Sequence, residues 1–316
     1  MGEGDRLSVD ERSSTPKTAD AVEAPRPARA ARPRNRAARL VSALGVVPFL
    51  AYLVVFLVIP TLTVVVGAFV EDGRFTLTVV GDLADPAVFG SLANSLVLSA
   101  VTALIGGVVG ALLAYAVVTG RPDGTLRRLV TSICGVLAQF GGVTLAFAFI
   151  ATLGISGVVS VWLDAHLGTG LTSSTWLFSL KGLVLVYAYF QIPLMVIVFL
   201  PALDGIRVQW REAAENLGAS TWQYWRLVAL PLLAPAFLGS LLLLFANAFA
   251  AYATAAALVS QGNPIIPLWI RSALTSEIVL GHANFAYALA LEMIIIVALV
   301  MTGYSLLLKR TARWLG

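Results

Sequence analysis

Charged residues and cysteine are both scarce in this 316-residue chain, and each scarcity excludes a class of protein. Asp, Glu, Lys and Arg make up 12% of the residues, whereas a soluble globular domain carries roughly 25%. The single cysteine, Cys134, excludes an internal disulfide and a metal site built from cysteines. Hydrophobic types make up 59%, and the mean hydropathy is +0.88. We therefore expect most of the chain to lie in a lipid bilayer.

The charges that are present concentrate near the N-terminus. Residues 1–39 hold nine of the 21 Lys and Arg and six of the 17 Asp and Glu. This segment is rich in Ala, Pro and Arg, so we predict a disordered basic tail that lies near anionic lipid headgroups. The rest of the chain is almost neutral, so the composition does not indicate a nucleic-acid partner.

Six apolar stretches are long enough to cross a membrane, which takes about 20 predominantly apolar residues. We predict an all-α polytopic membrane protein with one helix in each stretch. The predicted spans are 40–70, 91–118, 129–154, 182–203, 233–259 and 283–308. The first span is expected to stand apart from a five-helix core at residues 90–308, which a short tail at 309–316 follows.

The distribution of Lys and Arg predicts the orientation of these spans, because cytoplasmic loops carry the excess of basic residues. With the N-terminus inside, the cytoplasmic side holds the basic tail, three residues at 121–128, three at 204–232 and three after residue 308. The other side holds only Arg74, Lys181 and Arg271. Both termini are therefore expected in the cytoplasm.

The cytoplasmic loop at residues 204–232 differs from the apolar remainder of the chain. Its residues 211–217 are strong helix formers, and Arg211 and Glu215 stand four apart as an ion pair would. Gly218 follows where a helix end favours positive φ. A Ser-x-x-Gln capping box then starts a second short helix, and Pro231 marks the turn into the fifth span.

This loop resembles the E-A-A-x-x-x-G signature of ATP-binding-cassette (ABC) importer permeases. The matching residues are Glu212, Ala213, Ala214, Gly218, Ala219, Leu230 and Pro231. Trp225 and Val228 are mild departures from that pattern. The resemblance covers roughly residues 90–308 and implies a type I ABC importer permease in the bacterial cytoplasmic (inner) membrane.

The resemblance also implies a role and partners. The first short helix of the loop is expected to couple the membrane helices to a cytoplasmic ATPase. The chain has no G-x-x-x-x-G-K-[ST] motif, so we expect partner subunits to use the ATP and this chain to bind no cofactor. The implied partners are two ATP-binding subunits, a second permease that is identical or paralogous, an extracytoplasmic solute-binding protein and membrane lipid.

Four polar residues inside the apolar spans are candidates for the translocation path: Gln191, Asn247, Tyr252 and Glu292. Polar groups at this depth face a bundle interior or a water path, and hydrogen bonding between helices is the alternative role. Glu292 is either protonated and hydrogen-bonded to a neighbour such as Asn247 or Tyr252, or it is ionised, faces a wet cavity and favours a cationic solute. The sequence pattern is similar to permeases for polyamines, ferric iron, thiamine and aminoalkylphosphonates.

Two other functions are weighed against this one. An ion-coupled secondary transporter would show internal repeats and several intramembrane charges, whereas the spans hold only Glu292. An intramembrane serine protease would use the Gly-Ile-Ser-Gly sequence that contains Ser156, with His166 or His282 as a base. Both histidines lie in predicted outer loops.

Overall fold

The structure is a computed structural model that describes residues 46–71, 74–76, 81, 83, 85–120, 124–259, 265–275 and 283–312. These residues are mostly helical, and the predicted tail at 1–39 lies outside them. Six helical segments in this part of the chain are long and apolar enough to cross a membrane, as predicted. They are Val46–Gly67, Pro86–Val118, Gly142–Leu167, Leu180–Asp204, Thr221–Ala250 and Asn284–Leu306.

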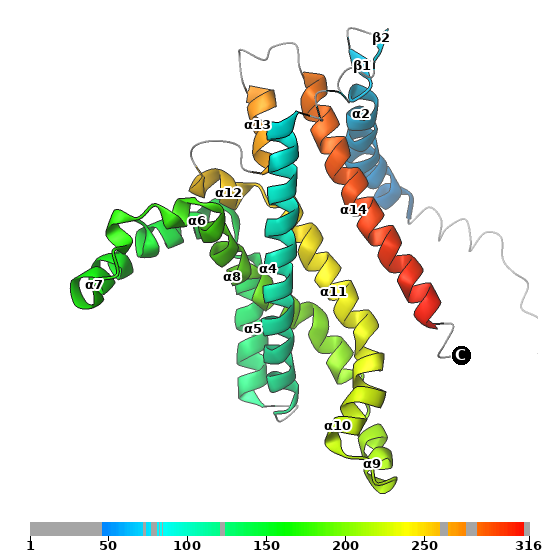
Figure 1. The fold of residues 1–316 in the computed structure, drawn as a ribbon. Helices are drawn as coiled ribbons and strands as arrows, with labels where there is room; N and C mark the ends of the chain where they lie inside the picture. Colours follow the sequence, from blue (N-terminus) through cyan, green and yellow to red (C-terminus); the bar gives the residue numbers. More distant parts are fainter. Residues whose placement is uncertain are drawn as a thin grey trace, which may run out of the picture. The chain divides into compact units, whose positions relative to one another are not determined.

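Three long helices pack against one another: α4 (Pro86–Val118), α8 (Leu180–Asp204) and α11 (Leu230–Ala250) (Figure 1). Small residues let α4 and α8 approach closely. A Cβ atom added to Gly110 would lie 2.5 Å from the Cβ of Met195, far inside van der Waals contact. Close approach of this kind is how membrane helices gain packing energy without a hydrophobic effect between them.

The third predicted span is wrong as a single helix. The segment at 129–154 is divided between α5 (Thr125–Gln139) and α6 (Gly142–Leu153), and the helical path continues into α7 (Val158–Leu167). The break falls at Gly142, whose φ of +71° is a conformation that glycine adopts readily. The chain stays apolar across the break, so hydropathy alone does not reveal it.

The fifth predicted span is wrong at its outer end. The segment at 233–259 was expected to be one helix, but α11 stops at Ala250 and the backbone is extended at Ala251. A separate short helix, α12 (Ala253–Leu258), follows and packs against α6. The two interrupted segments of the chain therefore meet.

The expected turn at Pro231 is also wrong. Helix α10 (Thr221–Tyr224) continues through a π-helical segment, η4 (Trp225–Ala229), directly into α11. Pro231 lies in the first turn of α11, where a π-type bonding pattern immediately precedes it. The helical path therefore continues through this residue.

The remaining elements complete the fold. Helix α13 (Ile266–Thr275) was not predicted, because ten residues are too few to span a membrane. It is attached to α4 by two hydrogen bonds, since the Ile266 amide donates to Ser95 Oγ and Trp269 Nε1 donates to Ser91 Oγ, both at 2.9 Å.

Antiparallel pairing joins β1 to β2. The other bounds are Val54–Val58 (η1), Ile59–Gly67 (α2), Val70–Glu71 (β1), Arg74–Phe75 (β2), Leu171–Ser173 (η2), Trp176–Phe178 (η3) and Ala283–Ala312 (α14).

Candidate coupling loop and translocation path

Helix α9 (Val208–Asn216) ends in a geometry that its sequence predicts. Gly218 has a φ of +77°. Its amide donates to the Glu215 carbonyl at 2.9 Å, and the Ala219 amide donates to the Ala214 carbonyl at 3.0 Å. These two bonds form a Schellman motif, which satisfies the last carbonyls of a helix and requires a left-handed residue at its centre. The expected positive φ at Gly218 is confirmed.

The second short helix, α10, begins with the predicted capping box. The Gln223 amide donates to Ser220 Oγ at 3.3 Å, and the Ser220 amide donates to Gln223 Oε1 at 2.7 Å. The predicted ion pair on α9 is also present, with 2.9 Å between Arg211 Nε and Glu215 Oε1. The Glu215 carboxylate raises the pKa of Arg211, which is charged at all ordinary pH values. The elbow between α9 and α10 is thus fixed on both sides of Gly218.

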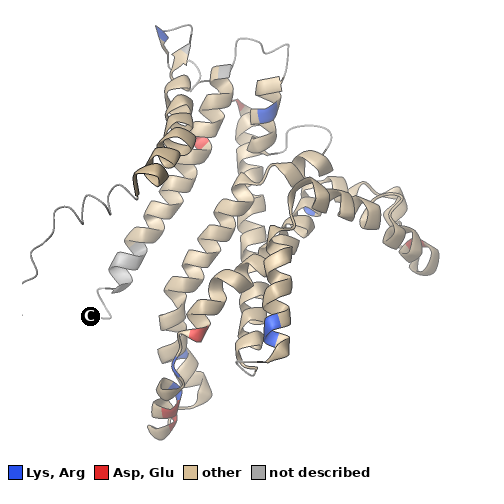
Figure 2. Cartoon of the chain, turned by 180° about the vertical axis from the view of Figure 1, so that it is seen from behind, with Lys and Arg blue, Asp and Glu red and all other residues tan. Residues whose placement is uncertain are grey.

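The elbow projects beyond the ends of the long helices, and charged residues gather around it, whereas the long helices are almost free of charge (Figures 1 and 2). Helix α9 has no buried residue. Glu212 and Ala213 are exposed, and the apolar side chains of Leu217 and Trp222 are 88% and 70% exposed. Leu217 lies outside the candidate membrane spans, whereas Trp222 lies at the start of the fifth one. Exposed apolar side chains of this kind mark a surface for a protein partner or for the membrane.

The seven residues of the expected coupling signature occupy two places. Five of them lie on α9 and its C-terminal cap, whereas Leu230 and Pro231 begin α11. The two places are connected by the continuous helical path through α10 and η4. The elbow and α11 are therefore joined by continuous helical backbone.

A polar cavity of about 270 Å³ lies where the two interrupted segments meet. Both helix breaks contribute backbone to its wall, and Phe190 of α8 completes it. The other lining residues are Ala138, Gly141, Gly142, Asn247, Ala250, Ala251, Tyr252, Ala253 and Thr254. None of the residues that line this cavity is charged.

Hydrogen bonds between different helical segments occur at both breaks. Thr254 Oγ1 donates to the Gly142 carbonyl at 3.2 Å, which joins the two breaks. The hydroxyl of the buried Tyr187 donates to the Ala251 carbonyl at 2.6 Å, directly at the end of α11. Carbonyl groups freed by a break in a membrane helix need such partners, because lipid offers none.

Three of the four candidate path residues are brought together by the structure. Asn247 and Tyr252 line the cavity. The fully buried Gln191 lies beside them, since its Nε2 donates to the Leu244 carbonyl at 2.7 Å and its Oε1 accepts from Asn247 Nδ2 at 3.4 Å. Gln191 of α8 and Asn247 of α11 are therefore hydrogen-bonded to each other as one network across the two helices, and Tyr252 shares the cavity wall with Asn247.

Glu292 is separate from that network. It lies on α14 and does not line the polar cavity. Among the described residues, no hydrogen bond joins it to Asn247 or Tyr252, and its buried Oε2 atom has no hydrogen-bond partner there. The expected bond between Glu292 and either residue is therefore wrong. Asn247 instead uses its amide on Gln191.

Two contributors to the cavity escaped the sequence analysis as path residues. Gly142 shapes one break and Thr254 closes the gap between the breaks. The adjacent pair Gly141 and Gly142 is the sequence signal that could have indicated this helix interruption, but the predicted span at 129–154 ran through it. The extended backbone at Ala251 has no such signal, because tertiary bonds such as that from Tyr187 stabilise it.

The arrangement of Ser156 does not support a protease. This residue is exposed in the turn between α6 and α7. His166 Nδ1 lies 2.8 Å from the Trp162 carbonyl oxygen, and its ring stacks on the Trp162 ring. In the described part of the chain, no hydrogen bond joins Ser156 to a histidine, and His282 lies outside that part. A hydrolytic nucleophile needs a base within hydrogen-bond reach.

Comparison with known proteins identifies the family. Residues 106–315 match the family described as binding-protein-dependent transport system inner membrane component. The chain belongs to this family. It is therefore an inner-membrane component, and the localisation expected from the sequence is confirmed.

Three permeases are among the curated proteins whose sequences are similar to this chain. The sulfate transport system permease protein CysT of Escherichia coli (strain K12) is 31% identical over 165 residues, or 52% of this chain and 56% of the relative. The molybdenum transport system permease protein ModB of Haemophilus influenzae is 27% identical over 135 residues, or 43% of this chain and 57% of the relative. The ferric transport system permease protein FbpB of Actinobacillus pleuropneumoniae is 27% identical over 202 residues, or 62% of this chain and 28% of the relative. The chain spans little more than half the length of the first two relatives.

Comparison with solved structures shows the fold. The chain matches one in the crystal structure of a bacterial ABC transporter involved in the import of the acidic polysaccharide alginate, with a TM-score of 0.70 and 19% identity over 86% of this chain and 96% of that one. It also matches a chain of the MetNI methionine ABC transporter in an inward-facing conformation, with a TM-score of 0.53 and 17% identity. That match covers 71% of this chain and 95% of the other. The fold is that of a type I ABC importer permease, as predicted.

Proposed function

We propose that this chain is the transmembrane permease subunit of an ATP-driven importer, and that it forms the path for a small water-soluble solute delivered by an extracytoplasmic binding protein. The observation that carries the proposal is the exposed elbow formed by α9, Gly218 and α10, of which α9 and Gly218 lie outside the candidate membrane spans and α10 begins the fifth one. Family membership and the fold support it.

The elbow is proposed as the docking site of a cytoplasmic ATP-binding subunit, which would use the ATP. Glu212, Ala213 and Ala214 lie on α9, and the exposed Leu217 offers apolar area at its end. Helix α11 has 21 residues, so its length is about 30 Å, enough to carry a movement across the hydrocarbon core. It ends at Ala250, in the wall of the polar cavity. The polar cavity and the elbow are thus at opposite ends of the helical path formed by α10, η4 and α11.

The proposed assembly follows from what one chain lacks. A second permease, identical or paralogous, would complete the translocation path, and two ATP-binding subunits would dock on the two elbows. The binding protein would meet the opposite face, where α13 and the β1–β2 hairpin lie (Figure 1). This orientation places both termini in the cytoplasm, in agreement with the distribution of basic residues.

The chemistry of the cavity bears on the solute. Its lining offers amide, hydroxyl and backbone groups without a charge, from residues such as Asn247, Tyr252 and Thr254. Three relatives are named for sulfate, molybdenum and ferric transport, which favours a small inorganic solute. A polyamine or aminoalkylphosphonate is the alternative, and it depends on Glu292, which lies outside this cavity.

Purification of the assembly in mild detergent, followed by mass spectrometry of the associated proteins, tests the proposal. We expect an ATP-binding-cassette ATPase with the native chain and its loss in Ala213→Trp, which adds bulk on the exposed face of α9. Leu126→Trp, at a 72% exposed position of α5, is the matched control and should keep the ATPase. An ATPase retained equally by both variants would contradict docking on α9. Uptake that persists without any ATPase would favour the ion-coupled transporter.

A further inference from the structure

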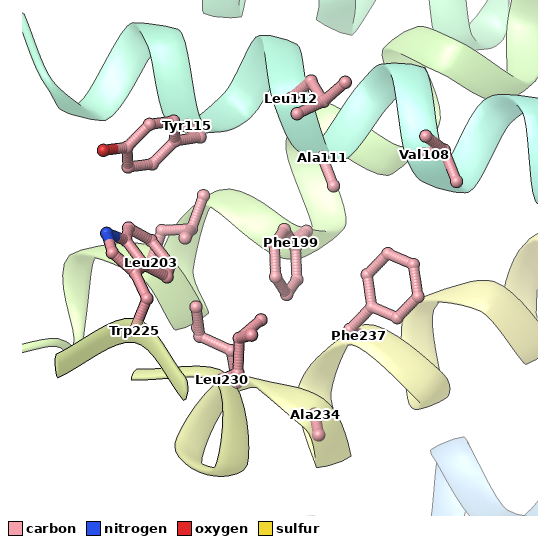
Figure 3. Close-up of a pocket in the computed structure, with 11 residues that line it drawn as sticks. Val108, Ala111, Leu112, Tyr115, Phe199, Leu203, Trp225, Leu230, Ala234 and Phe237 are labelled. Carbon is pink, nitrogen blue, oxygen red and sulfur yellow. The ribbon is translucent and has the colours of Figure 1, made fainter. Parts of the chain in front are cut away.

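An apolar groove with a volume of about 560 Å³ runs along the chain where α4, α8 and α11 meet (Figure 3). Val108 and Leu112 of α4 form one wall, and Phe237 of α11 lies opposite. Leu112 is 64% exposed, so the groove is open at this wall. Such a surface inside a membrane-spanning region is suited to an alkyl chain.

The polar atoms of the groove lie at one end. Only Tyr115 and Trp225, among the lining residues, carry a polar side-chain atom, and Figure 3 shows the hydroxyl and the indole nitrogen at the same end. Tyr115 is three residues before the end of α4 at Val118, or about 5 Å along the helix. Tyrosine and tryptophan concentrate at the level of lipid headgroups. The groove therefore runs from the membrane interface into the hydrocarbon layer.

A basic pocket of about 210 Å³ continues the groove at that end. It shares Tyr115 and Trp225 with the groove, and Arg207 and Arg211 line it. No acidic residue lines either cavity. The guanidinium carbon of Arg207 lies 6.0 Å from the centre of the Trp210 ring. The ion pair between Arg211 and the exposed Glu215 uses only the Nε atom of Arg211. The pocket thus has an excess of positive charge.

From this combination we propose that the groove and the basic pocket bind one anionic phospholipid of the cytoplasmic leaflet. An acyl chain lies along α4 and α11, and the phosphate lies at Arg207 and Arg211. Basic pockets at the cytoplasmic ends of membrane helices are suited to anionic headgroups. The inference rests on the orientation in the proposed function, because only that orientation places the arginines at the cytoplasmic leaflet.

A second copy of this chain fits the same surface less well. A twofold axis through the groove would bring two copies of this positively charged surface to one interface, because the patch meets itself. The lining residues offer no acidic group to compensate. A lipid phosphate supplies the missing negative charge. Trp225 belongs to η4, so the bound lipid would contact the segment between the elbow and α11.

Native mass spectrometry of the purified assembly tests the proposal, with phosphatidylglycerol and phosphatidylcholine as the two probes. The native protein should retain phosphatidylglycerol in preference to phosphatidylcholine. In the double variant Arg207→Gln and Arg211→Gln, retention of phosphatidylglycerol should fall by roughly fivefold for each arginine, which corresponds to about 1 kcal/mol near a membrane surface. Arg226→Gln removes an exposed arginine that lines neither cavity and should leave retention unchanged.

A second variant tests the groove itself. Ala234→Trp fills the groove and should lower the retention of both lipids, whereas Ala100→Trp, at an exposed position of α4 outside the groove, should not. Equal retention of phosphatidylglycerol in the native protein and in the double arginine variant would overturn the proposal. So would dimeric cross-linking through Leu112→Cys in a Cys134→Ala background, because it places a second chain on the groove. Lipid retention is measured without ATP or solute, so it is independent of transport.

Discussion

Thr254 and Gly142 are 112 residues apart in the chain, yet Thr254 Oγ1 donates a hydrogen bond of 3.2 Å to the Gly142 carbonyl. Each residue lies at an interruption of an apolar helical segment. The bond therefore connects the two breaks that frame the polar cavity. It fixes one break relative to the other.

Replacing Thr254 by valine tests this connection. The variant keeps the shape of the buried side chain but loses the donor, so we expect the free energy of unfolding to fall by about 1 kcal/mol. Uptake should fall with it, and Thr254→Ser should keep both. Thermal unfolding in detergent and solute uptake are the measurements. A valine variant with native stability and native uptake would show that the bond does not hold the breaks together.

Replacing Gly218 by valine tests the elbow. A Cβ atom at this position would meet no neighbour within 4 Å, so the substitution acts through its φ of +77° alone. The expected local strain is about 1–3 kcal/mol. Because Gly218 lies outside the candidate membrane spans, we expect normal abundance in the membrane and reduced uptake and ATPase stimulation.

Gly218→Asn is the matched control, since asparagine tolerates left-handed backbone better than valine does. It should retain more activity than Gly218→Val at equal abundance. If the two variants coupled ATP hydrolysis to uptake as well as the native chain does, the Schellman geometry would have no part in coupling.

Replacing Glu292 by glutamine separates the two solute classes. The change keeps the shape and hydrogen-bonding capacity of the side chain and removes its charge. Because Glu292 does not line the polar cavity, we expect uptake of a small inorganic solute to be unchanged. Uptake measured separately for an inorganic anion and for a polyamine checks this. Loss of polyamine uptake alone, with assembly intact, would instead assign Glu292 to a cationic solute.

The close packing of α4 on α8 gives a stability prediction. In Gly110→Ala the new Cβ atom would lie 2.5 Å from the Met195 Cβ and 2.7 Å from the Ile192 carbonyl oxygen. Overpacking of this kind costs about 1–3 kcal/mol, so the midpoint of thermal unfolding in detergent should fall. Gly90→Ala, on the same helix with no neighbour within 4 Å, should leave it unchanged or raise it. Equal midpoints would mean that the two helices pack less closely than described.

The features that the sequence predicted correctly depend on neighbouring residues. The cap at Gly218 and the capping box of Ser220 and Gln223 need only a few consecutive residues, so local patterns predict them. The number of spans follows from apolar length. Such features could be predicted because their physical cause lies within one segment.

The features that the sequence did not predict depend on distant contacts. The break at Ala251 is stabilised by Tyr187, 64 residues away, and the chain remains apolar through it. The groove combines α4, α8 and α11, so no single segment indicates it. Tertiary hydrogen bonds and packing, which a pattern along the chain does not contain, determine these parts of the structure.

Uptake by proteoliposomes that contain the complete assembly tests the central claim most directly. The probes are radiolabelled sulfate, molybdate and a polyamine, each supplied with the binding protein, and ATP is placed on the side of the α9–α10 elbow. We predict uptake of one probe that requires ATP and the ATPase subunits, persists with an uncoupler and is lost in Gly218→Val. Uptake that proceeds without the ATPase subunits and collapses with an uncoupler would contradict the account.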